Sequence, residues 1–188
     1  MIISIKHFCN PYIYFSIILI MLYNISCNAN NIPYSIKKIK VEEQIKNLPK
    51  ASYTNLENKK INLFELSKDN ILIINFWALW CTPCIKEMPA LHNLAKELEN
   101  SHVKIIYINQ DNFKDYKKVE SFIAKLNFHK GDVFMDFDMS SNKVFKLRGI
   151  PTTLISNGSG EIIWRIEGVI DWENKAIVYW LKNGAKKN

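Results

Sequence analysis

A mixed α/β fold is predicted by three features of this 188-residue sequence. Apolar runs of strand length alternate with amphipathic helical patterns. One of these runs, residues 71–77, is apolar except for Asn75, as expected of a strand that is covered on both faces. An Asn-Gly-Ser-Gly turn at 157–160 separates two further strands. We therefore expect one domain with a mixed central β-sheet flanked by helices, and the 48% hydrophobic content is sufficient for its core.

The first 29 residues have the composition of an export signal. Lys6 precedes an uncharged apolar stretch at 12–23, and small and polar residues follow up to Ala29. This order is typical of a secretory signal peptide that is cleaved after Ala29. An uncleaved membrane anchor and lipidation of Cys27 are the two alternatives. Each of the three places the rest of the chain outside the cytoplasm.

The folded domain is predicted to cover residues 49–188. Residues 30–48 are a mixture of Asn, Ser, Lys and Glu, and we interpret them as a linker between the signal or anchor at 1–29 and the domain. The domain begins with two short apolar pieces, 52–56 and 60–64, on either side of a polar turn. This pattern predicts a peripheral hairpin.

The next elements alternate between buried strands and amphipathic helices. After strand 71–77, apolar residues three and four positions apart predict a helix that follows Cys84, with a kink at Pro89. A second buried strand is expected at 103–108, and an amphipathic helix at 116–127.

The last part of the chain adds a strand pair and a closing helix. We expect a short strand at 132–135 and a helix at 140–147. Strands 152–155 and 161–166 flank the glycine-containing turn, and a helix at 172–181 closes the domain. The sequence contains no internal repeat.

The net charge of +7 does not by itself indicate a nucleic-acid site. Lysines are scattered along the chain, and arginine, the usual reader of bases and phosphates, occurs only at Arg148 and Arg165. We therefore interpret the lysines as a solvated surface and expect no nucleic-acid partner. Attraction of the lysines to an anionic membrane surface is a secondary alternative.

The motif that carries chemistry is Trp80-Cys81-Thr82-Pro83-Cys84, directly after the predicted central strand. Two thiols at this spacing can share one disulfide or release it as a dithiol. The order of strand, turn and helix places Cys81 at a helix N-terminus, where free N–H groups and the helix dipole stabilise a thiolate. The motif therefore predicts thiol–disulfide exchange.

The remaining cysteines support this interpretation. Cys9 and Cys27 lie in the predicted export segment, so that cleavage after Ala29 leaves only Cys81 and Cys84. One pair does not make a disulfide-stapled scaffold. A zinc site would need two more ligands at suitable spacing, and the histidines of the domain form no such pair. We therefore expect a redox site and no metal.

Three stretches carry a resemblance to a known family: 74–84 (Ile-Asn-Phe-Trp-Ala-x-Trp-Cys-x-Pro-Cys), 87–89 (Glu-Met-Pro) and 149–153 (Gly-Ile-Pro-Thr-Thr). Together they resemble the TlpA-like/ResA-like branch of the thioredoxin superfamily, which consists of exported or membrane-associated bacterial thiol–disulfide reductases. The resemblance covers residues 52–181. It implies a thioredoxin fold with two additions, an N-terminal hairpin and an inserted strand–helix unit. Residues 103–127 can form the inserted unit.

The resemblance also implies roles for matching residues. Cys81 corresponds to the exposed attacking thiol, and Cys84 corresponds to the resolving thiol. Pro151 corresponds to a cis-proline that faces the dithiol, so that Ile150 can offer its N–H and C=O to an extended substrate segment. Trp80 corresponds to an apolar wall beside the attacking thiol.

The proton chemistry is expected to lie on the helix. Thioredoxins have a buried Asp where this chain has Asn75, which cannot accept a proton. This branch of the family instead carries an acid after the motif, which is Glu87 in this sequence. We therefore assign Glu87 as the group that handles the proton of Cys84. A first-turn glutamate that only complements the helix dipole is the alternative.

Thr82 and Pro83 are expected to tune the redox poise. They place no cation between the cysteines, unlike strongly oxidising relatives with a histidine there, and this predicts a comparatively reducing couple. The resemblance implies a membrane thiol transporter of the DsbD/CcdA kind as electron donor. It implies apocytochrome c haem-attachment cysteines or the copper-site cysteines of cytochrome oxidase as clients. The expected location is the bacterial periplasm or the periplasmic face of the inner membrane. In the anchored form, residues 1–25 are the expected membrane tether. No cofactor is expected.

Other functions remain as alternatives. A copper-binding metallochaperone of the same fold would have a wider cysteine spacing and a late histidine, but no histidine follows His129. A peroxidatic enzyme would have a lone cysteine in a Thr-x-x-Cys pattern. A general disulfide oxidase or isomerase shares the motif and differs in redox poise.

Overall fold

The computed structural model describes residues 39–40 and 47–183. The predicted export segment at 1–29, including Cys27, lies outside the described residues, as does most of the predicted linker. Among the residues described, no helix is both long and apolar enough to cross a membrane.

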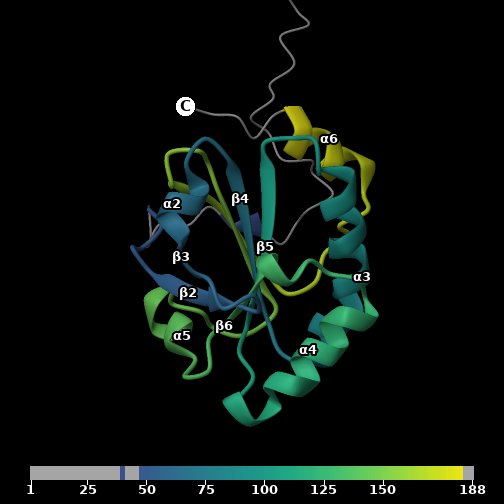
Figure 1. Cartoon of the computed structure of the whole chain (residues 1–188). Helices are drawn as coiled ribbons and strands as arrows, with labels where there is room; N and C mark the ends of the chain where they lie inside the picture. Colours follow the sequence, from purple (N-terminus) through teal and green to yellow (C-terminus); the bar gives the residue numbers. More distant parts are fainter. Residues whose placement is uncertain (1–38, 41–46, 184–188) are drawn as a thin grey trace, which may run out of the picture.

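One mixed sheet organises the described part of the chain (Figure 1). Its strand order is β1-β8-β7-β4-β5-β6-β2-β3, in which β4, β5 and β6 are parallel and the remaining pairs are antiparallel. The strands are β1 (Ile39–Lys40), β2 (Ser52–Asn55), β3 (Lys60–Asn62), β4 (Ile71–Trp77), β5 (Val103–Asn109), β6 (Val133–Met135), β7 (Thr152–Ser156) and β8 (Ile162–Glu167).

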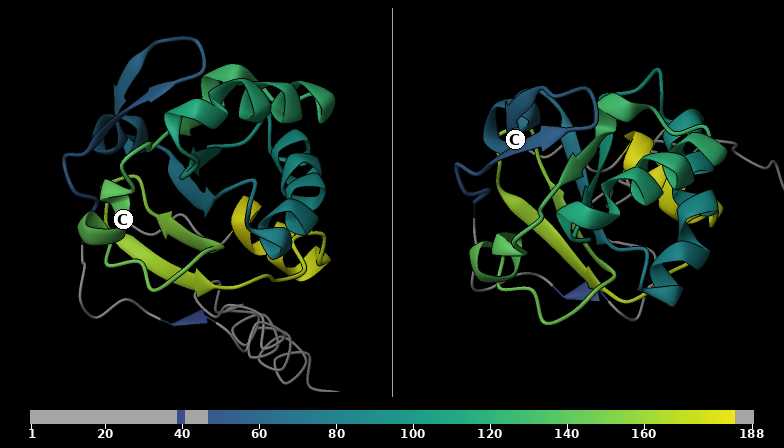
Figure 2. Two further views of the ribbon diagram at one scale, coloured as in Figure 1. Left: turned by 90° about the horizontal axis from the view of Figure 1, so that it is seen from below. Right: turned by 60° about the horizontal axis from the view of Figure 1, so that its bottom comes forward.

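Helices cover both faces of the sheet. Helices α3, α4 and α6 lie on one face, and the short helices α2 and α5 lie on the other (Figure 2). The helices are α2 (Leu63–Ser67), α3 (Thr82–Glu97), α4 (Tyr116–Lys125), α5 (Ser140–Val144) and α6 (Lys175–Asn183), with 3-10 turns η1 (Phe113–Asp115) and η2 (Lys130–Asp132).

Strand β4 explains why the domain has two cores. All seven of its residues are buried, because it lies between β5 and β7 and is covered on both faces. Successive side chains of a strand alternate between faces. Ile73 and Trp77 therefore join the α3 core, and Ile74 joins the core under α2. The same alternation places the polar side chain of Asn75 on the α3 face.

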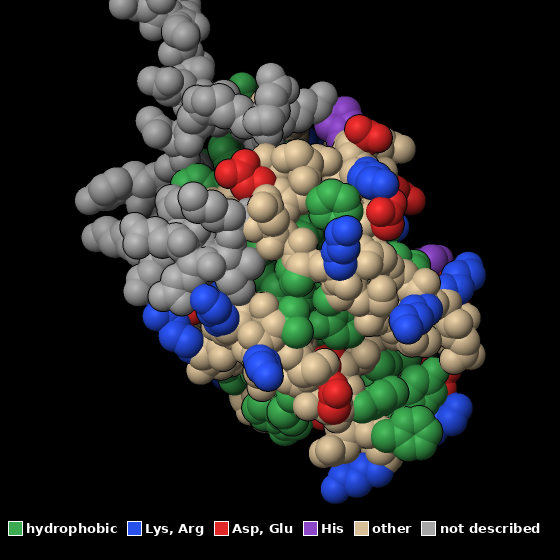
Figure 3. Space-filling view, turned by 90° about the vertical axis from the view of Figure 1, so that its left-hand side faces the viewer, with side chains coloured by type: hydrophobic (Ala, Val, Ile, Leu, Met, Phe, Trp, Pro, Cys, Tyr) green, Lys and Arg blue, Asp and Glu red, His purple; other side chains and the backbone are tan. Residues whose placement is uncertain are grey.

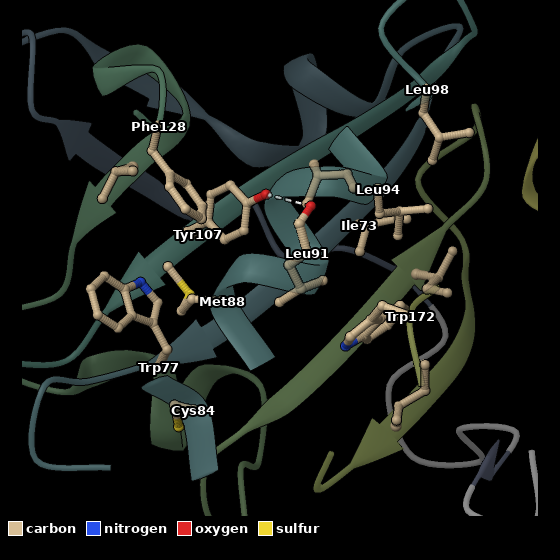
Figure 4. Packing of buried hydrophobic residues seen from close by; sticks show 14 of the residues in the cluster. Ile73, Trp77, Cys84, Met88, Leu91, Leu94, Leu98, Tyr107, Phe128 and Trp172 are labelled. Carbon is tan, nitrogen blue, oxygen red and sulfur yellow. Dashed lines mark hydrogen bonds between the residues drawn. The ribbon is translucent and has the colours of Figure 1, made fainter. Parts of the chain in front are cut away.

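The α3 core is built from the apolar row that the sequence indicated. Met88, Leu91, Leu94 and Leu98 line the buried side of α3 and the residue after it. Figure 4 shows this row beside Trp77, with the Tyr107 ring packed against it. The Tyr107 hydroxyl donates to the Leu91 carbonyl at 3.3 Å, which satisfies a buried polar group inside the core.

The structure confirms the predicted fold and most of its elements. The hairpin at 52–64, the central strand at 71–77 and the strand–helix unit at 103–127 are present as β2–β3, β4 and β5–α4. Helix α3 continues through Pro89, which lies on its exposed side.

Several boundaries differ from the prediction. The second half of the hairpin ends in the short helix α2, because the Asn62 side chain accepts hydrogen bonds from the Phe64 and Glu65 N–H groups and caps a new helix. The predicted helix at 140–147 ends at Val144, and the closing helix begins at Lys175 rather than at Trp172.

Part of the predicted linker belongs to the domain. Strand β1 pairs with β8 at the sheet edge. Asn47 forms a bridge with Glu161, and Leu48 is buried in the core under α2. The hydrogen bond from the Leu48 N–H to the Gly160 carbonyl, 2.7 Å long, fixes this entry into the domain. The polar composition of 30–48 concealed these contacts, because an edge strand needs few apolar residues.

The charged side chains form no large patch on the face of the described part shown in Figure 3. On the face shown in Figure 3, the basic side chains are spread over the whole surface, and hydrophobic side chains gather in the lower part of the view. Several lysines are paired with nearby acids, including Lys118 with Asp115 and Lys130 with Glu120.

Candidate active site

The two cysteines of the motif are joined by a disulfide at the start of α3. Cys81 is the N-cap residue, as the strand–turn–helix order predicted, and its Sγ accepts a hydrogen bond from the Cys84 N–H at 3.3 Å. Pro83 lies in the first turn, where a missing N–H costs no helical hydrogen bond. Cys81, which was expected to be exposed, is nearly buried in the disulfide form at 5% exposure, but it is more accessible than Cys84, which is fully buried.

A carboxylate on the neighbouring strand fixes the loop before the cysteines. Asp111 follows β5, and its Oδ2 accepts from the Leu79 N–H at 2.7 Å and from the Asn109 side-chain amide at 2.7 Å. Because β4 and β5 are parallel and adjacent, their carboxyl ends bring these residues together. Asp111 was not predicted from the sequence, although the polar run Asn109-Gln110-Asp111 at the end of a buried strand was a visible signal.

Glu87 is buried on α3, one turn after Cys84. Its Oε1 accepts from the Asn75 side-chain amide at 2.9 Å, and its Oε2 accepts from the Trp172 indole N–H at 3.2 Å. Burial raises the pKa of Glu87 above its ordinary value, and these two hydrogen bonds oppose part of that rise. A carboxyl with a raised pKa beside a buried thiol is suited to proton transfer near neutral pH.

Asn75 connects this carboxyl to the strand after Pro151. Its Nδ2 also donates to the Thr153 hydroxyl at 3.0 Å, and its Oδ1 is buried with no hydrogen-bond partner among the described residues. Trp172 and Thr153 were not identified from the sequence. Trp172 lies 85 positions from Glu87, and no local pattern relates the two residues.

The Ile150–Pro151 bond is cis, as the resemblance implied. Pro151 precedes β7, whose residue Thr152 pairs with Phe76, so that it lies at the sheet edge from which the cysteine loop emerges. Pro151 is buried and its carbonyl accepts from the Gly168 N–H at 2.8 Å. Ile150 is half-buried, and no backbone hydrogen bond joins it to another residue of the described part.

The structure thus brings the predicted site residues to one end of the sheet. Trp80, which precedes Cys81, is 59% exposed. Thr82 and Pro83 are exposed on the first turn of α3. Within 39–40 and 47–183, no group of three or more His, Cys, Asp or Glu side chains is arranged to hold a metal ion.

A reactive pair of cysteines at a helix N-terminus, with a buried acid behind it and a cis-proline at the same sheet edge, defines a thiol–disulfide oxidoreductase of the thioredoxin fold. Comparison with known proteins agrees with this class. The chain belongs to the AhpC/TSA family, whose sequence model matches residues 45–167. The thiol-disulfide oxidoreductase ResA of a Bacillus cereus strain is 33% identical over 129 residues, and the match covers 65% of this chain and 69% of that protein. The ResA-like resemblance is confirmed.

Solved structures show the same fold. StoA from Bacillus subtilis is 25% identical with a TM-score of 0.59, and the match covers 71% of this chain and 98% of StoA. A secreted disulfide oxidoreductase from Mycobacterium tuberculosis is 18% identical with a TM-score of 0.58, and the match covers 69% of this chain and 95% of that one.

Replacing Glu87 with glutamine is expected to stabilise the oxidised protein at neutral pH and to slow its resolving step. The raised pKa of Glu87 means that the carboxyl contributes most to stability below pH 4.5, its ordinary pKa, and that this contribution is lost as pH rises through the folded-state pKa. Glutamine carries no charge to bury. Urea unfolding at pH 4 and pH 8 should therefore show a stability gain that appears mainly at pH 8.

The same variant tests the proton role. Without the carboxylate, release of a mixed disulfide by Cys84 should slow by about 100-fold at pH 7. Glu99→Gln removes an exposed carboxylate just after α3 and is the matched control for charge. If Glu87→Gln leaves both the release rate and its pH dependence unchanged, Glu87 is only a structural residue of the helix.

Proposed function

We propose that this chain reduces disulfides of client proteins outside the cytoplasm. The observation that carries the proposal is the arrangement of the thiols. Cys81 caps a helix of 16 residues whose dipole favours a thiolate, and Cys84 is buried one turn away from Glu87. A dithiol with one accessible and one protected sulfur is suited to two-step exchange.

In the proposed cycle, the Cys81 thiolate attacks one sulfur of the client disulfide. This forms a mixed disulfide and releases the other client sulfur as a thiolate, which takes up a proton. Cys84 then loses its proton to Glu87 and attacks the Cys81 sulfur, which breaks the bond between Cys81 and the client and releases the second client thiolate to take up a proton. The client leaves with two thiols, and the enzyme holds the Cys81–Cys84 disulfide. Two electrons have passed from the enzyme to the client.

Several observations support the proposed direction and location. Thr82 and Pro83 place no cation between the thiols, which favours a reducing couple. The signal-like composition of 1–29 and the secreted relative of the same fold favour a location outside the cytoplasm. A reductase in an oxidising compartment needs an electron supply across the membrane, for which we propose a thiol transporter of the DsbD/CcdA kind. The proposed clients are apocytochrome c haem-attachment cysteines or copper-site cysteines.

The variant Cys84→Ser is expected to trap the client. Cys81 remains free to attack, but the mixed disulfide cannot be resolved, because a serine hydroxyl does not attack the Cys81 sulfur and displace the client thiolate. Cells that express the full-length variant should accumulate a covalent adduct that disappears on reduction. Mass spectrometry of the adduct then identifies the client and the linked cysteine.

The double variant Cys81→Ser/Cys84→Ser is the control and should form no adduct. Equilibration of the wild type with glutathione buffers tests the direction, and a potential near that of a strong oxidant, about −120 mV, would contradict a reductase. If no specific adduct forms and the reduced wild type binds Cu(I) tightly, the metallochaperone alternative is favoured.

A further inference from the structure

We propose that Phe113, Tyr116 and Phe137 form a docking surface for the client polypeptide, on the opposite side of the dithiol from Pro151. The surface binds an apolar side chain of the client about three residues from the attacked cysteine. This inference rests on the proposed reduction of client disulfides and adds a determinant of client choice. We refer to the three residues as the aromatic platform.

Strand register places the aromatic platform at the same end of the sheet as the reactive sulfur. Trp77, Asn109 and Met135 lie in one row across the parallel strands β4, β5 and β6. The chain leaves all three strands at the same edge of the sheet, where β4 leads to Cys81. Phe113 follows the row by four residues, and Phe137 follows it by two.

Pro151 lies on the other side of this centre. It precedes β7, which pairs with the edge of β4 that faces away from β5. The order along the sheet is therefore Pro151, Cys81 and then the aromatic platform. Because Ile150 and the platform lie on opposite sides of Cys81, the client residues that contact Ile150 cannot also contact the platform. The platform therefore binds a different part of the client.

The platform exposes two aromatic rings, those of Phe113 and Phe137, which contact each other and the half-buried Tyr116. Phe113 is 74% exposed and Phe137 is 37% exposed. Their ring centroids are 5.3 Å apart at an interplanar angle of 77°, and the Tyr116 centroid is 6.4 Å from that of Phe137. Single exposed apolar residues are common on protein surfaces, but adjoining exposed rings beside a reactive centre are typical of a binding surface.

Buried hydrogen bonds hold the loop that carries Phe137. Its neighbour Asp136 is buried and accepts from the Ser141 N–H at 3.2 Å and from the Ser141 hydroxyl. The Gln110 side chain, which is buried after β5, donates to Asp136 Oδ2 at 3.2 Å and to Asn142 Oδ1 at 2.8 Å. These contacts join the loops after β5 and β6 into one unit.

The loop that carries Phe113 is fixed to the cysteine loop as well. Asp111 accepts from the Leu79 N–H at 2.7 Å, two residues before Cys81. The aromatic platform is therefore held in place relative to Cys81 before a client arrives. A surface that is already ordered loses less conformational entropy when it binds.

The occupant is an apolar side chain of an extended client segment. Neighbouring strands are about 4.8 Å apart, so that β6 lies roughly 10 Å from β4. An extended peptide advances about 3.3 Å per residue, and three residues therefore span this distance. The charges near the platform are mixed, with Lys117 over the Tyr116 ring and Asp138 next to Phe137. The platform therefore favours neither acidic nor basic client segments.

Single-turnover oxidation of the reduced protein by synthetic peptides tests this inference. Three oxidants are compared: a disulfide-bonded peptide with Phe three residues to either side of its cysteines, the same peptide with Ser at those positions, and oxidised glutathione. The second-order rate constant of the wild type should be about tenfold higher for the Phe peptide than for the Ser peptide. Phe113→Ala/Phe137→Ala should lose this preference and keep its rate with glutathione.

Tyr179→Ala is the matched control. Tyr179 is an exposed aromatic residue of α6, a helix whose Lys182 contacts Glu97 at the far end of α3 from Cys81. This variant should keep the preference for the Phe peptide. Equal losses on all three oxidants, or a wild type without preference, would overturn the aromatic platform as a docking surface.

Two further measurements distinguish a client site from a failed reductase function and from a contact between two copies of the chain. One outcome separates the two proposals. The wild type reduces none of the three oxidants, but it still binds a cysteine-free Phe peptide more tightly than the double variant does. The platform then remains a docking surface, and the proposed reductase function fails. Light scattering of the wild type and the double variant tests self-association. A wild-type dimer that the double substitution dissociates would assign the surface to a second copy of the chain and overturn a client site.

Discussion

Replacing Cys81 with serine is expected to abolish disulfide reduction, with a fall of at least about 1,000-fold in the rate constant for a peptide disulfide. A serine hydroxyl does not ionise near neutral pH and cannot form the mixed disulfide. Cys84 cannot take over the attack, because it is fully buried behind Cys81. The measurement is single-turnover oxidation of the reduced variant, followed by thiol titration.

Cys84→Ser is the control that separates attack from resolution. This variant keeps the accessible thiol at the N-terminus of α3 and should form a mixed disulfide at a rate within about tenfold of the wild type. The opposite pattern, in which Cys81→Ser retains attack and Cys84→Ser loses it, would reverse the assignment of the two thiols.

Replacing Trp172 with alanine is expected to lower the free energy of unfolding by about 3–5 kcal/mol. Trp172 is fully buried in the α3 core, and Figure 4 shows its ring near Ile73. The substitution leaves a cavity and removes the indole donor from Glu87, whose carboxylate is itself buried. Urea unfolding of the oxidised protein at pH 7 measures the loss.

Two variants divide this effect into its parts. Trp172→Phe keeps most of the ring volume and removes the indole N–H, so it should cost about 1–3 kcal/mol. Loss of that hydrogen bond also raises the pKa of Glu87 further, which moves the pH dependence of the resolving step upward. Tyr179→Ala on the exposed side of α6 should change stability by less than about 0.5 kcal/mol. A Trp172→Ala cost as small as that of Tyr179→Ala would contradict the packing role.

Much of the fold could be predicted because local patterns and tertiary structure agree. The apolar run of β4 is buried on both faces, as its composition required, and the glycine-containing turn between β7 and β8 lies where the sequence indicated. The thiol pair was identified because its motif follows a strand and starts a helix, and Glu87 and Pro151 were identified because the sequence resembles the TlpA-like/ResA-like branch.

The remaining features depend on contacts that no local pattern contains. Trp172 reaches Glu87 across 85 positions, and the sequence indicated only an apolar residue near a helix start. Strand β1 is held by pairing with β8 rather than by its own composition. Helix α2 depends on one cap by Asn62, which a hairpin pattern conceals.

Asn75 gives the proton on Glu87 an effect beyond α3. Both oxygens of Glu87 accept hydrogen bonds, so protonation turns one acceptor into a donor that needs a new acceptor. The buried Oδ1 of Asn75, which has no partner among the described residues, meets that need when the amide turns over. The turn moves the Nδ2 group that binds Thr153, two residues after Pro151. In the proposed cycle, a proton that Glu87 takes from the resolving thiol therefore alters a hydrogen bond on β7, the strand that follows Pro151.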